Sequence, residues 1–128
     1  MPSACIDTDR DGYERALAAA PGAVVLPGGT PISTCLRRVR TDADLQNLGA
    51  TVHSVAEELA AQARGGDADA ALALGFFSAA VSRGAARSSG ISSELARRVQ
   101  TAGVGVREHS PAVARALDEG LAAGAAHG

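Results

Sequence analysis

The residues with the clearest chemical spacing lie near the start of the chain. Asp7, Asp9 and Asp11 stand at alternate positions in the stretch DTDRDG, and Tyr13 follows its glycine. Calcium takes carboxylate and carbonyl oxygens as ligands, and alternate spacing along a loop lets several of them converge on one ion. The three aspartates and the Tyr13 carbonyl therefore form a candidate metal site, for calcium.

This stretch resembles the first half of an EF-hand-type calcium loop, in which a glycine follows the third ligand. The second half departs from that pattern, because Arg15 and Ala18 stand where the last ligands belong, including the bidentate glutamate. The same residues also predict a helix start without any ion. Asp11 is a suitable N-cap, and Glu14 three residues later completes a capping box. We expect the capped helix start, and weak calcium binding is the alternative.

A second candidate is the arginine-bearing segment RGAARSSGISSELARRVQ at residues 83–100. Its small residue, glycine and apolar residue around the break, at Ala86, Gly90 and Ile91, resemble the second half of a bacterial helix-turn-helix. The resemblance implies that the following helix presents its polar face to DNA. Against this reading, the helix before the break is predicted to be long and buried. The formal net charge of −2 also provides no general attraction to nucleic acid.

The remaining candidates do not assemble a catalytic set. His53 and Glu57 have the spacing of a metal-ligand pair on a helix, but no second pair completes a site. His109 and Ser110 are neighbours, so their side chains point apart. Cys35 precedes an arginine pair that would favour its thiolate, but no histidine can be placed beside it as a base. We therefore predict that the protein is not an enzyme and holds no cofactor.

The composition favours helices that associate with other surfaces. Alanine is the commonest residue, glycine numbers 15, and aromatic residues make up only 2% of the chain. Alanine-rich helices form readily, but each alanine buries little apolar area. The sequence thus predicts a thin core and contact with a partner chain or a second copy. The exclusive use of arginine among the basic residues, with this alanine and glycine content, indicates a GC-rich bacterial genome.

The apolar runs and the first residues bear on location. The longest apolar run, at residues 70–81, is too short to cross a bilayer. The acidic N-terminal stretch lacks the apolar centre of a secretory signal. We predict a cytoplasmic protein without membrane contact, in which Cys5 and Cys35 are free thiols; a disulfide between them is the alternative and requires an oxidising setting.

Apolar periodicity predicts a helical bundle over residues 41–126. A cap at Thr41 opens a helix with an apolar seam that ends at a glycine pair; the seam consists of Leu45, Leu48, Val52, Val55 and Leu59. Asp67 caps the next helix, at about 68–87, which is apolar nearly all round and should be the central buried helix. Further helices start near Ser93 and at Ser110, where a proline follows the cap.

The N-terminal third is less regular. Residues 12–20 predict a short helix that ends at a proline and a glycine. The stretch AVVL at 23–26 and the turn residues after it allow a small hairpin with residues 32–36. A helix that begins at Pro31 is the other possibility. We expect an irregular or hairpin-like segment at 21–40.

Together these patterns predict one all-α domain over residues 1–128, with an N-terminal part at 1–40 and a bundle of about four main helices. Its predicted function is to bind a macromolecule, above all another protein chain or a second copy of itself. A DNA-binding regulator is the alternative. The predicted contact surface consists of Arg37, Arg38, Arg40, Ser93, Glu94, Arg97 and Arg98.

Overall fold

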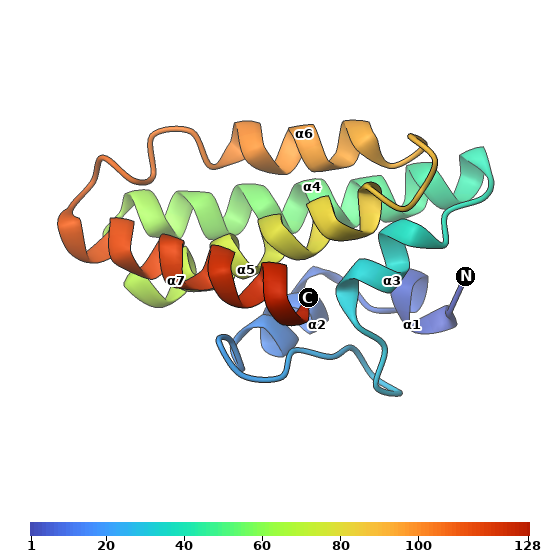
Figure 1. The fold of residues 1–128 in the computed structure, drawn as a ribbon, viewed down its shortest axis with the longest axis horizontal. Helices are drawn as coiled ribbons and strands as arrows, with labels where there is room; N and C mark the ends of the chain where they lie inside the picture. The colour runs from blue at the N-terminus through green and yellow to red at the C-terminus, as the bar shows by residue number, and fades with distance from the viewer.

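The computed structural model describes residues 1–128 and contains helices without any β-strand (Figure 1). The elements are α1 (Ser3–Asp7), α2 (Arg10–Leu17), α3 (Ile32–Arg37), α4 (Asp42–Arg64), α5 (Ala68–Ala85), α6 (Ser93–Ala102) and α7 (Pro111–His127). The predicted all-α class is confirmed. None of these helices combines the length and the apolar character that a membrane span requires.

The four longest helices form the bundle, and each runs in the direction opposite to the one before it (Figure 1). Helix α5 lies at the centre, where it contacts α2, α3, α4, α6 and α7. Eleven of its 18 residues are buried. Helix α5 is apolar around its whole circumference because neighbouring helices cover it on several sides.

Glycines bring α5 and α7 into backbone contact. A Cβ atom at Gly75 of α5 would lie 2.2 Å from the carbonyl oxygen of Leu117 in α7. A Cβ atom at Gly120 would lie 2.1 Å from the carbonyl oxygen of Leu72 in α5. Because neither position carries a side chain, the two helices approach each other closely. They make the most extensive contact between any two helices of the fold.

Local capping signals place the helix starts. Thr41, Asp67 and Ser110 each accept a hydrogen bond from the backbone N–H three residues later, as the sequence predicts. The cap of α2 differs from the prediction, because Asp9 rather than Asp11 holds that position. Its Oδ1 atom accepts a hydrogen bond from the Gly12 N–H at 2.8 Å.

The segment before α4 is helical where a hairpin was one possibility. Residues 32–37 form α3, so a strand at 32–36 is wrong, and the only bridge in the region joins Leu26 to Thr30. The physical reason lies in the spacing of the apolar residues. Ile32, Leu36 and Val39 are buried at helical intervals, and a strand would have buried alternate residues.

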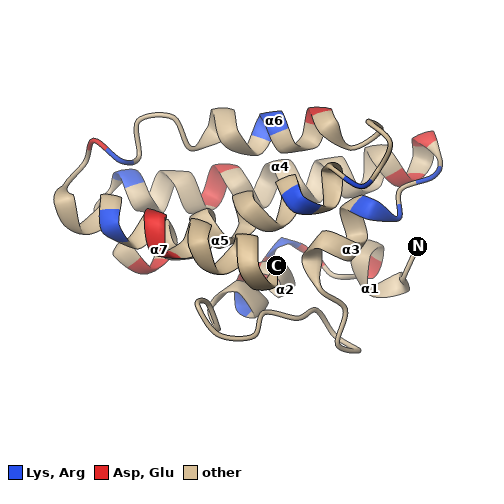
Figure 2. Ribbon diagram, viewed as in Figure 1, with Lys and Arg blue, Asp and Glu red and all other residues tan.

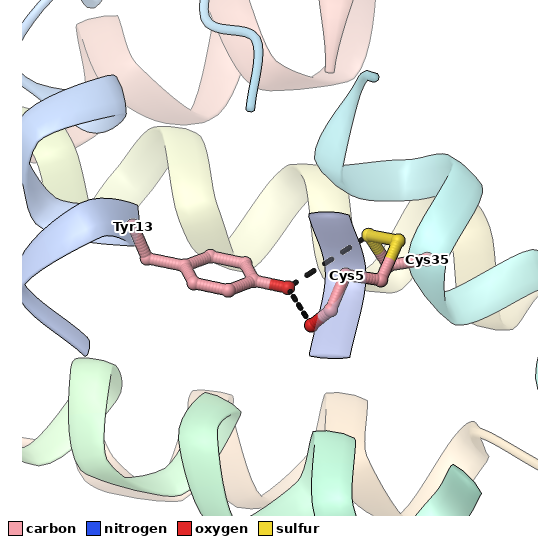
Figure 3. The surroundings of a disulfide bond; sticks show 3 residues. All are labelled: Cys5, Tyr13 and Cys35. Carbon is pink, nitrogen blue, oxygen red and sulfur yellow. Dashed lines mark hydrogen bonds between the residues drawn. A yellow bond between two sulfur atoms is a disulfide. The ribbon is translucent and has the colours of Figure 1, made fainter. Parts of the chain in front are cut away.

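The prediction of free thiols is also wrong. Cys5 of α1 and Cys35 of α3 form a disulfide, with a Cα–Cα distance of 5.5 Å (Figure 3). The hydroxyl of Tyr13 donates to the carbonyl oxygen of Cys5 at 2.8 Å and lies 3.8 Å from the Cys35 sulfur. The thiols were expected to be free because a cytoplasmic setting was assumed, and the sequence does not show that α1 and α3 are neighbours.

One continuous core of 30 buried residues runs from Cys5 to Leu117. It includes all three aromatic side chains, and the rings of Tyr13 and Phe77 pack edge to face at 6.4 Å. The N-terminal part and the bundle therefore share one core.

Candidate functional site

The acidic stretch near the start of the chain spans the end of α1 and the beginning of α2. Asp7 closes α1, Asp9 caps α2, and Asp11 lies in the first turn of α2, 3.6 Å from the guanidinium of Arg10. Tyr13 belongs to α2, and its side chain is buried with the hydroxyl directed at the disulfide. No group of three histidine, cysteine, aspartate or glutamate side chains lies in a position to hold a metal ion. The structure therefore does not bring the three aspartates together as a ligand set.

The candidate DNA-reading segment forms the end of α5, a turn and α6. In a helix-turn-helix the two helices cross at a steep angle, whereas α6 runs back alongside α4 and α5 (Figure 1). On α6, Glu94 pairs with both Arg97 and Arg98. Both arginine side chains stay more than half exposed and are accessible to a ligand.

Three of the four residues predicted on α6, namely Glu94, Arg97 and Arg98, line an open groove between α4 and α6. The groove has a volume of about 610 Å³, and its lining consists of His53, Glu57, Arg64, Glu94, Arg97, Arg98, Thr101 and Ala102. Three of the predicted contact residues therefore face residues of α4, while Ser93 is not part of the lining. We call this feature the α4–α6 groove.

Charges of both signs lie along the α4–α6 groove. The Nε atom of Arg98 is 3.5 Å from the Glu94 carboxylate, which Arg97 also contacts. Arg64 donates to the backbone carbonyls of Ala102 and Val104 and so ties the end of α4 to the end of α6. Glu57 makes no ion pair and leaves a free carboxylate in the groove.

The α4–α6 groove continues toward the start of α4. A second hollow of about 420 Å³ shares His53, Glu94 and Arg98 with it. The rest of this hollow consists of Leu45, Gln46, Gly49, Ala50 and Leu95. The groove thus has a charged end and a more apolar end, and this arrangement suits an extended ligand.

The other predicted contact residues lie elsewhere. Arg37 lines a separate hollow together with Arg83 and Arg87, while the Arg40 guanidinium donates to the backbone carbonyl of Arg37. Arg38 is exposed and lines neither hollow. Figure 2 shows basic segments gathered where the end of α5 meets α3. The predicted surface therefore divides into two sites.

The other sequence candidates do not form a catalytic set. Cys35 belongs to the disulfide and is not a free nucleophile. Ser110 caps α7, while the His109 ring packs near Gly66. The pKa of Glu14 is raised, first by burial and then by the nearby charge of Glu58. Glu14 lines none of the hollows described above.

The sequence singles out His53 and Glu57 only as a metal-ligand spacing and does not single out Arg64, so it does not predict the α4 side of the groove. His53, Glu57 and Arg64 stand at i, i+4 and i+11, a spacing that places them on one face of a helix. That signal was available, but it does not tell which helix faces them. Comparison with protein-family models, with curated proteins and with solved structures gives no match to this chain.

Proposed function

We propose that the protein is a non-enzymatic binding module that holds a segment of another polypeptide in the α4–α6 groove. The observation that carries the proposal is the meeting of Glu94, Arg97 and Arg98 with His53 and Glu57 along one open groove. Two helices form its walls, and it extends into a hollow with apolar lining.

The chemistry of the groove favours a polypeptide over other ligands. The groove does not suit an apolar small molecule, because pockets for such ligands are mainly apolar and only one of the eight residues that line the groove is hydrophobic. DNA would bring phosphates close to the carboxylates of Glu57 and Glu94, which would repel them. A polypeptide with side chains of both signs can pair with both.

A separate partner fits better than a second copy of the chain. Permanent homodimers bury large apolar surfaces. Only Val25, Ile91 and Val104 are large exposed hydrophobics here, and they lie in three different segments. Contact through the groove would rest on polar and charged groups, and such contacts are typical of interactions that form and dissociate.

The disulfide bears on the compartment. The cytoplasmic location predicted from the sequence implies reduced thiols, whereas disulfides persist in oxidising surroundings. The Cys5–Cys35 bond therefore supports an oxidising compartment as the place of action. Because both cysteines are buried, acid quenching of cells followed by thiol alkylation of the unfolded protein would check this: unlabelled cysteines are expected, and full labelling of both would restore the cytoplasmic prediction.

Site-specific photocrosslinking tests the groove itself. Thr101 lies in the groove and is exposed, so a photoreactive residue there should form an adduct with the partner. Ala122 is an exposed position on α7 outside the groove and gives the matched control. The double change Arg97→Ala and Arg98→Ala should abolish the adduct from Thr101 while the helical circular dichroism stays unchanged.

Two outcomes would contradict the proposal. Equal adducts from Thr101 and Ala122 would show contact without a preferred surface. An adduct from Thr101 that survives loss of both arginines would show that the charged end of the groove does not recognise the partner. Duplex DNA that binds with a steep salt dependence and is lost in the same double variant would instead favour the DNA-binding alternative.

A further inference from the structure

A second hollow lies where α3 packs on α5, away from the α4–α6 groove. It has a volume of about 310 Å³, and no hydrophobic side chain lines it. The lining consists of Pro31, Ser33, Thr34, Arg37, Arg83, Gly84, Arg87, His127 and Gly128. We call this feature the arginine pocket.

Close packing of the two helices creates the arginine pocket. A Cβ atom at Gly84 would lie 2.2 Å from the carbonyl oxygen of Ser33, so the absent side chain lets α3 approach α5. Arg83 lies in the last turn of α5 and Arg87 in the turn that follows the helix, and both line the pocket. The approach of α3 places Arg37 beside them.

The three guanidinium groups have no partner of opposite charge. None of them forms an ion pair with any carboxylate. No acidic side chain lines the pocket. Arg37 and Arg83 are nevertheless half-buried. Like charges that line one pocket repel one another, and an anion between them would reduce that repulsion.

The shape and chemistry of the lining indicate the class of anion. Guanidinium groups donate in pairs to phosphate oxygens, and Ser33 and Thr34 in the lining bring hydroxyl groups as further donors. The volume lies at the lower end of the roughly 300–1,000 Å³ typical of small-molecule sites. A phosphate group alone would leave part of it empty.

A neighbouring hollow offers space for the rest of such a ligand. This hollow, of about 350 Å³, shares Pro31 and His127 with the arginine pocket and is lined otherwise by residues 21–25. It includes Val25, whose side chain is 47% exposed although hydrophobic. Polar donors on one side and an apolar patch on the other suit an ester with a phosphate head and an apolar body.

We propose that the arginine pocket binds the phosphate group of a small organic phosphate monoester, whose organic part lies against residues 21–25. The site is independent of the α4–α6 groove, so either proposal can fail without the other.

Isothermal titration calorimetry with phenyl phosphate, and with inorganic phosphate as the minimal probe, tests the inference. We expect both to bind, and phenyl phosphate to bind more tightly because its ring covers Val25. Arg87→Gln should weaken binding of both by roughly tenfold or more, since a charge-assisted hydrogen bond is lost. Arg87 is exposed, so this variant should fold normally. Arg83→Gln should act in the same direction.

The control is Arg115→Gln, which removes an exposed arginine that also makes no ion pair but lies on α7 outside the pocket. Its affinity for both probes should equal that of the unchanged protein. Equal weakening by Arg115→Gln and Arg87→Gln would reduce the effect to overall charge and overturn the site.

Three further results would overturn the inference or part of it. Absence of any heat with millimolar inorganic phosphate or phenyl phosphate would exclude the site. Equal affinities for the two probes, unchanged by Val25→Ser, would exclude the apolar half of the ligand. Cosedimentation with phosphatidylcholine vesicles that contain phosphatidic acid, without binding of phenyl phosphate, would assign the pocket to a lipid headgroup and contradict a soluble ester.

Discussion

Gly75 has no room for a side chain larger than its own hydrogen atom, because α7 packs directly against its backbone. The backbone of α7 occupies the space of a Cβ atom, which would meet the Leu117 oxygen at 2.2 Å. Gly75→Ala should therefore force α5 and α7 apart and lower the free energy of unfolding by at least about 2 kcal/mol, despite the better helix propensity of alanine. Urea denaturation followed by circular dichroism measures the loss.

Gly103→Ala is the matched control for this change. A Cβ atom there would meet its nearest neighbours at 3.6 Å or more, which is ordinary contact. Its φ of −80° also suits any residue. The variant should unfold at the same denaturant concentration as the unchanged protein, or slightly higher. If Gly75→Ala behaves like Gly103→Ala, the backbone contact between α5 and α7 is not as close as described.

Tyr13 predicts an alkaline limit to stability. Burial raises the pKa of its hydroxyl well above the ordinary value of 10.0, so the folded state holds this proton more tightly than the unfolded state does. The stabilisation is complete below about pH 10 and is lost as the pH rises above it, by up to about 1.4 kcal/mol per pH unit for one proton. The chain has no lysine to titrate in the same range.

Denaturation curves recorded between about pH 9 and about pH 11.5, a range that brackets the ordinary tyrosine pKa, would check this slope. Tyr13→Phe should flatten the dependence above about pH 10, although it loses the hydrogen bond to Cys5 and is less stable throughout. A slope that is equal in both proteins would assign the alkaline limit to another group.

At the scale of elements, the disulfide joins two helices that are too short to be stable alone. Helices α1 and α3 have 5 and 6 residues, and isolated helices of that length do not persist in water. The bond closes a loop with a separation of 30 residues. By loop-closure entropy it should contribute about 3–4 kcal/mol to the free energy of unfolding.

Denaturation with and without a reductant measures that contribution. The doubly substituted variant Cys5→Ser and Cys35→Ser should match the reduced protein in stability and show no response to reductant. Equal stability of the oxidised and reduced proteins would show that packing alone fixes α1 and α3.

The sequence predicts the elements whose signals are local. Thr41, Asp67 and Ser110 cap the helices as expected because a cap depends on a few consecutive residues. Helix α3 is short and its apolar spacing competes with strand and turn signals at 23–30, so the same local reasoning does not decide it. The Cys5–Cys35 bond depends on the approach of distant segments, which no local pattern encodes.

The candidate sites follow the same division. Glu94, Arg97 and Arg98 were predicted together because they share one face of one helix. Their neighbours on α4 were not, since the pairing of α4 with α6 is a property of the packed bundle. For the same reason the sequence predicts the arginine pocket only in part. It singles out Arg37, whereas Arg83 and Arg87 join the pocket because Gly84 lets α3 approach α5.

For the molecule as a whole, the shared core predicts a single unfolding transition. The buried cluster includes residues from the N-terminal part and from every helix of the bundle. With the disulfide intact, near-ultraviolet circular dichroism, which reports on Tyr13, and far-ultraviolet circular dichroism, which reports mainly on α4–α7, should give coincident curves. An earlier transition at Tyr13 would show that residues 1–40 unfold as a separate unit.

The bond between Cys5 and Cys35 also turns the first part of the chain into a covalent ring. The exposed turn at Gly28 and Gly29 lies inside that ring, and exposed turns of small residues are preferred cutting sites for proteases. A protease that cuts there would open the ring without releasing the N-terminal segment, because the bond still ties α1 to α3. The nicked molecule would consist of two chains that separate only on reduction, and α1 and α2 would keep their places against the bundle after the cut.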